Sequence, residues 1–359
     1  MNSAILPYLA SPICHQPLEF VSPDQLKEVS GTEVFPIVEG IPLLQPPGQF
    51  AEWYSESLEV IFQERSAEML ARIAAPTGDE WAANLSHIVL DEYGIDGVRK
   101  AFRSYAKLSR EKRMTGFVHV APSELSAEHP LVQQRAIESR REYARSDYSK
   151  LHFESLKEQV RTWAFHIPDY AAAVLAHDSE LIVELGTGAG LGTSALIEAG
   201  LGSARLITID VDYSCTGNAE GLAKVCGLEK RVDGIVANFW FLPFPDNSVD
   251  VVCSHYGIDE SREMSRVITE VYRVLADGGR FVAVCRSDGS LRLSIYLDGL
   301  GFSKDELRSM ASQADIYPGS ERLIEIAGEN GLALEKRQTI TPDEGQQRDI
   351  LVFRKQGHA

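Results

Sequence analysis

The residues best placed to do chemistry stand in and around a glycine-rich run. Gly186, Gly188 and Gly190 follow the apolar stretch Leu181–Leu185, and a helical pattern begins at Leu191. Glycines at this spacing let the backbone turn sharply and let a ligand approach without meeting a β-carbon. Open α/β sheets bind their ligands where such a strand gives way to such a loop. The run therefore predicts a ligand site.

The spacing of the glycines argues against a nicotinamide or flavin dinucleotide. The dinucleotide fingerprint is G-x-G-x-x-G/A. Its third glycine would fall on Leu191 if the motif began at Gly186, and on Thr193 if it began at Gly188.

Asp210 closes the next apolar stretch and could accept both hydrogen bonds of a ribose diol, each contributing about 1.5–3 kcal/mol.

Candidates for acid–base chemistry follow the fourth predicted strand, Val249–His255. His255 is the best candidate for a general base because an unperturbed imidazole titrates near neutrality. Tyr256 is the second candidate. The alternative for His255 is a ring that packs or lines the pocket without transferring a proton. Arg286, at the end of the fifth strand, and Asp288, just beyond it, could bind a polar substrate.

Strands and helices alternate from residue 180 onward, which indicates βαβ units and a mostly parallel sheet. The last two strands, Leu332–Ile340 and Asp349–Arg354, have too short a link for a parallel crossover, so we expect them to be antiparallel. The predicted fold is α/β, with a seven-stranded, mostly parallel sheet and helices on both faces. Tyr148, Trp163 and Tyr170 precede the first strand and could line the pocket, although core packing is the simpler interpretation.

The chain divides into three parts by composition. Residues 1–48 are rich in proline and read as a small β-rich module. Residues 49–150 follow helical periodicity and read as a linker or substrate cap. Residues 151–359 form the third part, in which strands and helices alternate from residue 180 onward.

Four ordered segments between residues 180 and 286 resemble the class I S-adenosylmethionine (SAM)-dependent methyltransferases. They are the E-x-G-x-G-x-G run, the strand ending in Asp210, LPFPDNSVDVV at 242–252, and EVYRVLADGGRF at 270–281. The last two resemble the branch that contains ubiquinone and menaquinone C-methyltransferases. Asn238 stands where this family usually has an aspartate facing adenine, and an amide oxygen can still accept that hydrogen bond. The resemblance implies a cofactor site for SAM and its product S-adenosylhomocysteine, formed by Glu184, Gly186, Thr187, Gly188, Gly190, Asp210, Asn238, Phe239 and Ser254.

The N-terminal segment resembles a small zinc-ribbon family that includes activator subunits of tRNA and protein methyltransferases. LASPICHQPL at 9–18 and SGTEVFPIVEGIPLL at 30–44 carry the resemblance. Ser11 and Ser30 stand where this family has cysteines, and Cys14 remains. A tetrahedral zinc site needs four ligands. We therefore predict a module without metal, which docks on the rest of the chain or on a partner.

Charge and cysteine usage narrow the function classes. The chain of 359 residues has 35 basic and 52 acidic residues, a formal net charge of −17. Such a surface repels phosphate backbones and makes nucleic acid an improbable partner. The five cysteines contain no C-x-x-C pair, which suits a reduced, cytoplasmic setting. No apolar run is long enough to cross a membrane.

The leading hypothesis is a cytoplasmic biosynthetic enzyme, a SAM-dependent methyltransferase acting on an oxygen or carbon of a small molecule or peptide. One alternative is an RNA or translation-factor methyltransferase, because the zinc-ribbon family that the N-terminal segment resembles includes activator subunits of such enzymes. Another is a non-catalytic scaffold or regulator with this fold. A homodimer, or a protein partner bound through the N-terminal module, is compatible with each of them.

Overall fold

The structure is a computed structural model of the chain. It describes residues 2–46, 145–162, 164–211, 213–260, 264–288, 319–341 and 347–357, with isolated positions at 141, 303, 305–306 and 309. Almost all of the helical region predicted at 49–150 lies outside the described residues, as does Trp163.

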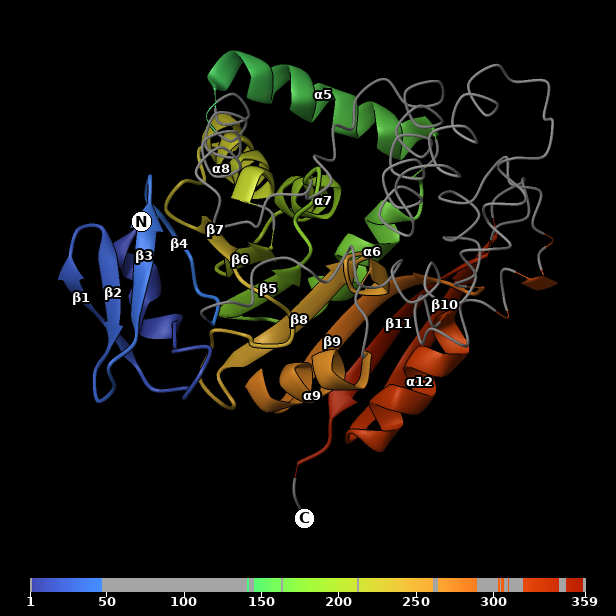
Figure 1. Ribbon diagram of the computed structural model, residues 1–359. Coiled ribbons are helices and arrows are strands. Elements are labelled where there is room, and N and C mark those ends of the chain that lie inside the picture. The colour runs from blue at the N-terminus through green and yellow to red at the C-terminus, as the bar shows by residue number, and fades with distance from the viewer. Residues whose placement is uncertain are drawn as a thin grey trace, which may run out of the picture.

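The C-terminal part of the chain, from residue 146 onward, is built on one seven-stranded sheet in the order β10-β11-β9-β8-β5-β6-β7 (Figure 1). β5, β6, β7, β8 and β9 pair in parallel, and β11 runs antiparallel to β9 and β10. This confirms the predicted fold class and the antiparallel pair at the end of the chain. The strands are β5 (Leu181–Leu185), β6 (Arg205–Asp210), β7 (Val232–Val236), β8 (Val249–His255), β9 (Leu275–Arg286), β10 (Leu332–Ile340) and β11 (Arg348–Lys355).

Helices cover both faces of this sheet (Figure 1). One face carries α5 (Ser146–Thr162), α6 (Ile167–Val174), α7 (Leu191–Ala199) and α8 (Tyr213–Cys226), and the other carries α9 (Met264–Val274) and α12 (Gly319–Glu329). Central strand β5 is buried along its whole length, because both of its faces are covered. Helix α5 runs through the boundary predicted at residue 150 and packs on α8 and α7. No helix within the described ranges is long and apolar enough to cross a bilayer.

The two edges of the sheet are protected in different ways. An exposed edge strand invites unwanted pairing, and charged side chains reduce that risk. At one edge, β10 presents the exposed run Glu335–Arg337. At the other edge, β7 is covered by the N-terminal module: the Leu44 N–H donates to the Val236 carbonyl at 2.8 Å.

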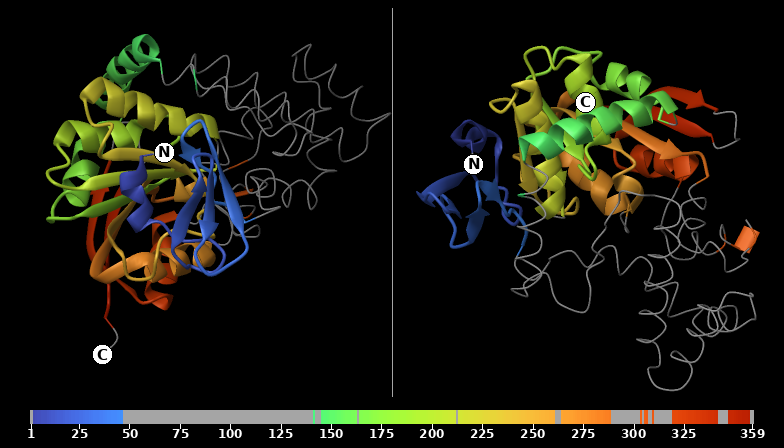
Figure 2. Two further views of the ribbon diagram at one scale, coloured as in Figure 1. Left: turned by 90° about the vertical axis from the view of Figure 1, so that its left-hand side faces the viewer. Right: turned by 90° about the horizontal axis from the view of Figure 1, so that it is seen from above.

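The N-terminal module is a four-stranded antiparallel sheet attached to the C-terminal part (Figure 2). Its strands are β1 (Leu18–Ser22), β2 (Gln25–Glu28), β3 (Val34–Val38) and β4 (Ile41–Pro42), preceded by the 3-10 helix η1 (Ser3–Tyr8). Ile5, Leu9 and Phe35 belong to one continuous core with strands of the large sheet. The predicted docking of the module on the rest of the chain is confirmed by these contacts. Docking on a partner or a second copy stays a prediction.

A carboxylate lies beside the position where the zinc-ribbon resemblance predicts lost cysteine ligands. The Ser11 hydroxyl donates to the Glu28 carboxylate at 2.5 Å, and the Cys14 thiol donates to it at 3.0 Å. Burial alone would raise the pKa of Glu28, but these bonds and the backbone N–H groups nearby lower it below its ordinary value. Within the described part of the chain, no three His, Cys, Asp or Glu side chains are grouped to hold a metal ion.

Glu28→Ala should lower the free energy of unfolding by about 2 kcal/mol, because it leaves the buried Ser11 hydroxyl and its neighbours without an acceptor. The matched control is Glu19→Ala, on the exposed side of β1, with an expected change within about 0.5 kcal/mol. Urea unfolding measures both variants. Equal effects would mean that the Glu28 bonds do not support the module.

Elemental analysis of the purified chain should find less than one equivalent of zinc.

Candidate active site

The glycine loop between β5 and α7 is held in a conformation that favours glycine. Gly186, Gly188 and Gly190 have φ angles of 88°, 48° and 85°, in the left-handed region. The Gly188 N–H donates to Oδ2 of Asp210 at 2.8 Å, and Nδ2 of Asn218 donates to the Gly188 carbonyl at 2.7 Å. A β-carbon at Gly188 would meet nothing within 4 Å. The loop is therefore anchored on one side and open on the other, with the Asp210 carboxylate beside it.

Helix α5 reaches the same loop from above the sheet. Nε2 of His152 lies 2.6 Å from the Ala189 carbonyl oxygen. A carbonyl can only accept, so His152 carries its proton on Nε2 in this contact. Neither His152 nor Asn218 was predicted from the sequence, because no motif marks them and only the fold brings them to the loop.

The loop that follows β8 lies directly against the glycine loop. The Ser254 hydroxyl donates to the Leu185 carbonyl at 2.8 Å and accepts from the Ile258 N–H at 3.1 Å. A β-carbon at Gly257 would lie 2.8 Å from Cα of Gly186. Two loops far apart in the sequence thus meet backbone to backbone, and Ser254 is buried where it ties them together.

Glu184 lies beneath the glycine loop rather than on its open side. The side chain is 1% exposed and accepts a hydrogen bond from the Thr193 hydroxyl at 2.5 Å. Burial and the Asp210 charge together raise the pKa of Glu184 to about 8, against the hydrogen bond from Thr193, which lowers it. Gly192 leaves room for this carboxyl, since a β-carbon there would lie 2.2 Å from Oε1 of Glu184.

The remaining predicted cofactor residues sit beside the ends of β5, β6 and β7. Thr187 is buried and its hydroxyl bonds that of Thr208. Asn238 follows β7, and its Oδ1 accepts from the Trp240 N–H at 2.9 Å, which fixes the turn. Phe239 is 8% exposed and packs in the core. Their contact with a cofactor stays a prediction.

His255 is paired with a second histidine that the sequence did not single out. Nε2 of His255 lies 2.9 Å from Nε2 of His166, the residue at the start of α6. Burial, and then the charges of Arg348 and Arg286, lower the pKa of His166 to about 3. Burial, His166 and the same two arginines lower the pKa of His255 well below its ordinary value. The two rings are therefore neutral near pH 7, and one donates its N–H to the other.

Tyr256 is strained and partly buried next to this histidine pair. Its φ of 62° is unusual for an aromatic residue and marks stored backbone strain, of order 1–3 kcal/mol. Its ring centroid lies 4.6 Å from that of His255. Burial raises the pKa of Tyr256 to about 12, although Arg286 and Arg348 act in the opposite direction. The phenol is thus a hydrogen-bond donor at neutral pH and not a base.

The histidine pair makes stability depend on pH. An unfolded histidine titrates near pH 6.5, and the folded His166 titrates near 3. Between pH 3 and pH 6.5 the unfolded chain therefore binds more protons than the folded one. The contribution of His166 to the free energy of unfolding is complete above pH 6.5 and is lost as the pH falls. From pH 6.5 to 5, His166 alone should remove about 2 kcal/mol from the free energy of unfolding.

His166→Gln should reduce that loss, as measured by urea unfolding at several pH values. His177→Gln, an exposed histidine, is the matched control and should change the slope much less. A slope unchanged in His166→Gln would contradict a neutral buried histidine at this position.

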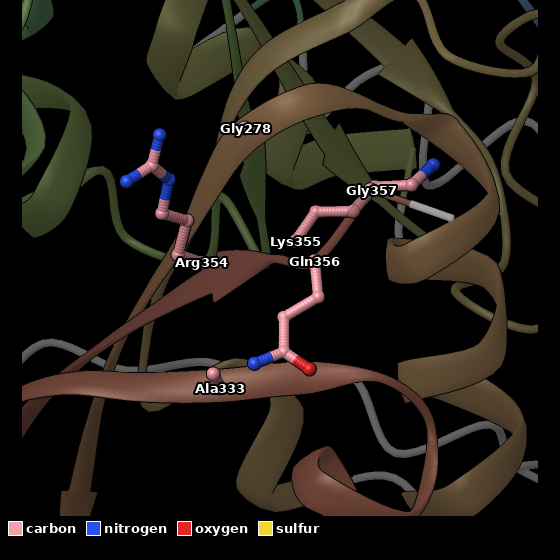
Figure 3. A pocket seen from close by; sticks show the side chains of 6 residues that line it. All are labelled: Gly278, Ala333, Arg354, Lys355, Gln356 and Gly357. Carbon is pink, nitrogen blue, oxygen red and sulfur yellow. The ribbon is translucent and has the colours of Figure 1, made fainter. Parts of the chain in front are cut away.

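A surface hollow of about 350 Å³ lies elsewhere (Figure 3). Gly278, Ala333, Arg354 and Lys355 line it, at the edge of the sheet where β9 begins and β11 ends. The glycine loop, Asp210 and His255 lie at the opposite end of the strands, where the parallel strands finish. The hollow is therefore not part of the candidate active site.

Comparison with known proteins supports the resemblance to the methyltransferases described in the sequence analysis. Residues 183–283 match the family model described as a methyltransferase domain. The ubiquinone/menaquinone biosynthesis C-methyltransferase of Bartonella bacilliformis is 27% identical over 103 residues, which are 29% of this chain and 40% of that protein. Demethylmenaquinone methyltransferase of Thermobifida fusca is 30% identical over 118 residues, 31% of this chain and 45% of that protein. The chain spans less than half the length of these curated relatives.

Solved structures with a similar arrangement include a geranyl diphosphate C-methyltransferase from Streptomyces coelicolor. Its TM-score is 0.43 at 14% identity, covering 59% of this chain and 85% of that one. The N-methyltransferase NodS of Bradyrhizobium japonicum has a TM-score of 0.40 at 16% identity, covering 57% and 98%. From the strand order, the glycine loop and the family match at 183–283, this chain carries a class I SAM-dependent methyltransferase domain.

Proposed function

We propose that this chain transfers a methyl group from SAM to an oxygen or carbon atom of a small molecule in the cytoplasm. The observation that carries the proposal is the Asp210 carboxylate, fixed beside the open side of the glycine loop by the Gly188 N–H. The matched relatives named above as C-methyltransferases support the carbon acceptor. The RNA, translation-factor and scaffold alternatives gain no support from the comparisons.

The residues present fit this cofactor. Asp210 would accept from the ribose hydroxyls, and Asn238 would face the adenine with the second lone pair of its amide oxygen. The glycine loop leaves the space that a β-carbon at Gly188 would fill. Glu184 and Ser254 would act from beneath, by holding the loops that form the site. Bound there, SAM supplies an electrophilic methyl group on a sulfonium.

The chain's own residues then have to orient the acceptor and take its proton. Holding nucleophile and methyl in line accounts for much of the rate. His255 is the neutral ring at the end of β8, and we assign it the role of proton acceptor, with His166 keeping its orientation. Tyr256 remains protonated and would donate a hydrogen bond to the acceptor. The nearby arginines disfavour an imidazolium, so this base needs an offsetting negative charge.

Calorimetric titration with S-adenosylhomocysteine tests the proposal first. We expect a dissociation constant in the micromolar range or lower. Incubation with methyl-labelled SAM and a panel of small molecules should then place label in one chemical class. Absence of binding would contradict the proposed function and favour the scaffold alternative.

A further inference from the structure

Buried polar atoms without a partner are concentrated at one place in this molecule. Among the described residues, seven buried side-chain nitrogen or oxygen atoms have no hydrogen-bond partner. Two belong to Gln45 in the linker after the N-terminal module. The other five lie together next to His255: Nδ1 of His166, the hydroxyls of Tyr170 and Tyr256, and Nη1 of Arg286 and of Arg348.

The two arginines meet at the edge of the sheet where the parallel strands end. Arg286 is the last residue of β9, Arg348 is the first of β11, and they are directly paired in the ladder. They share the sheet face of Val284 and Ile350, which is the face of α6 and His255. The Arg286 guanidinium stands 4.6 Å from the centre of the Tyr256 ring. The Arg286 guanidinium therefore lies against Tyr256, the residue after the proposed base, and Arg348 is the neighbour of Arg286 in the ladder.

The acidic partner of this cluster offsets only part of its charge. Oδ2 of Asp259 lies 3.8 Å from Nη1 of Arg286, beyond hydrogen-bond distance. Among the described residues, the charges with the largest effect on Tyr256 are those of Arg286 and Arg348 against that of Asp259, while the Cys285 thiol stays neutral. These described groups leave one positive charge uncompensated. A buried charged donor without an acceptor is costly, so such groups are usually explained by a ligand.

The nature of that ligand follows from this charge and geometry. Guanidinium groups bind carboxylates and phosphates through paired N–H···O bonds. A single carboxylate matches the one uncompensated positive charge, whereas a phosphate dianion would leave a buried negative charge. The rings of Tyr256 and His255, whose centroids lie 4.6 Å apart, provide an apolar wall beside the two arginines.

We propose that the methyl acceptor carries a carboxylate, which Arg286 and Arg348 bind beside His255. This inference rests on the proposed function and names the substrate class of that same site. Placing a negative charge on the two arginines would also remove one cause of the unfavourable imidazolium at His255 and His166. The substrate's own carboxylate would then prepare the base that acts on it.

Ligand-observed NMR tests the carboxylate site in the full chain, with and without saturating S-adenosylhomocysteine. The probes are acetate and benzoate, their neutral amides acetamide and benzamide, and inorganic phosphate at constant ionic strength. We expect at least one carboxylate to bind, its amide to bind at least tenfold more weakly, and phosphate to bind more weakly than the carboxylate.

Two variants separate the site from general charge. Arg348→Gln should weaken carboxylate binding at least tenfold without lowering the melting temperature, because it removes a buried donor that lacks a partner. Arg280→Gln is the matched control on β9, the strand that also carries Arg286. Arg280 is paired with Glu335 at 2.8 Å, and the carboxylate affinity of this variant should equal that of the wild type.

The outcomes distinguish this inference from the proposed function. If S-adenosylhomocysteine binds but no carboxylate does, the carboxylate acceptor is wrong and the methyltransferase proposal stands. Equal binding of acid and amide, tighter binding of phosphate, or unchanged affinity in Arg348→Gln would each overturn the inference. If a carboxylate binds through Arg348 but S-adenosylhomocysteine does not bind, the proposed function is wrong.

Discussion

Asp210→Ala should weaken the binding of S-adenosylhomocysteine about a hundredfold, or about 3 kcal/mol. Two charge-assisted hydrogen bonds to a ribose diol contribute about 1.5–3 kcal/mol each, although they are not additive. The substitution also leaves the Gly188 N–H without its acceptor at 2.8 Å, so the loop loses its anchor. Calorimetry measures the change.

Two further variants make the Asp210 test specific. Asp210→Asn keeps the shape and one acceptor oxygen, and should weaken binding less than the alanine variant does. Asp277→Asn removes an exposed carboxylate near the opposite edge of the sheet and should leave the affinity unchanged. Unchanged affinity in Asp210→Ala would remove Asp210 from the cofactor site.

Gly257→Ala should be among the most destabilising substitutions in the chain, lowering the free energy of unfolding by about 4 kcal/mol or more. A β-carbon at this position would lie 2.3 Å from the Leu185 carbonyl oxygen and 2.8 Å from Cα of Gly186. Both are backbone atoms, so relief requires moving the end of β5 or the glycine loop itself. Interiors packed this tightly resist such movement.

Gly328→Ala is the matched control for the close contact at Gly257. It lies inside α12, and a β-carbon there would meet nothing within 4 Å. Replacing a glycine within a helix should stabilise the chain by about 0.5–1 kcal/mol. Urea unfolding measures both variants, and binding of S-adenosylhomocysteine to any folded Gly257→Ala shows whether the loop has moved. A Gly257→Ala variant as stable as the wild type would mean that the two loops are not in contact.

The elements of the catalytic part could be predicted because their patterns are local and strong. Leu181–Leu185, Leu191–Ala199 and Val249–His255 have the predicted bounds. A buried parallel strand must be apolar throughout, and a glycine loop followed by a helix has few other structural uses.

The histidine pair shows where sequence reasoning stopped. His255 was a candidate base, but His166 stands 89 residues earlier with no motif around it. The same holds for Arg348, which meets Arg286 only because β11 enters the sheet antiparallel to β9. Glu184 and Ser254 were predicted to belong to the cofactor site, and the structure shows both buried in hydrogen bonds that hold the loops. Their contact with a cofactor stays a prediction.

The sequence by itself determined the α/β class, the order of strands and helices, the glycine loop, and the placement of Asp210 at a strand end. These features depend on hydrophobic period and on backbone conformations that few residues allow. The tertiary structure decided that two histidines are hydrogen-bonded to each other, that Arg286 and Arg348 beside them each have a buried Nη1 without a hydrogen bond, and that the N-terminal module covers the β7 edge. Those facts depend on which strands become neighbours, and the burial that shifts a pKa or leaves a donor without a partner exists only after the chain has packed.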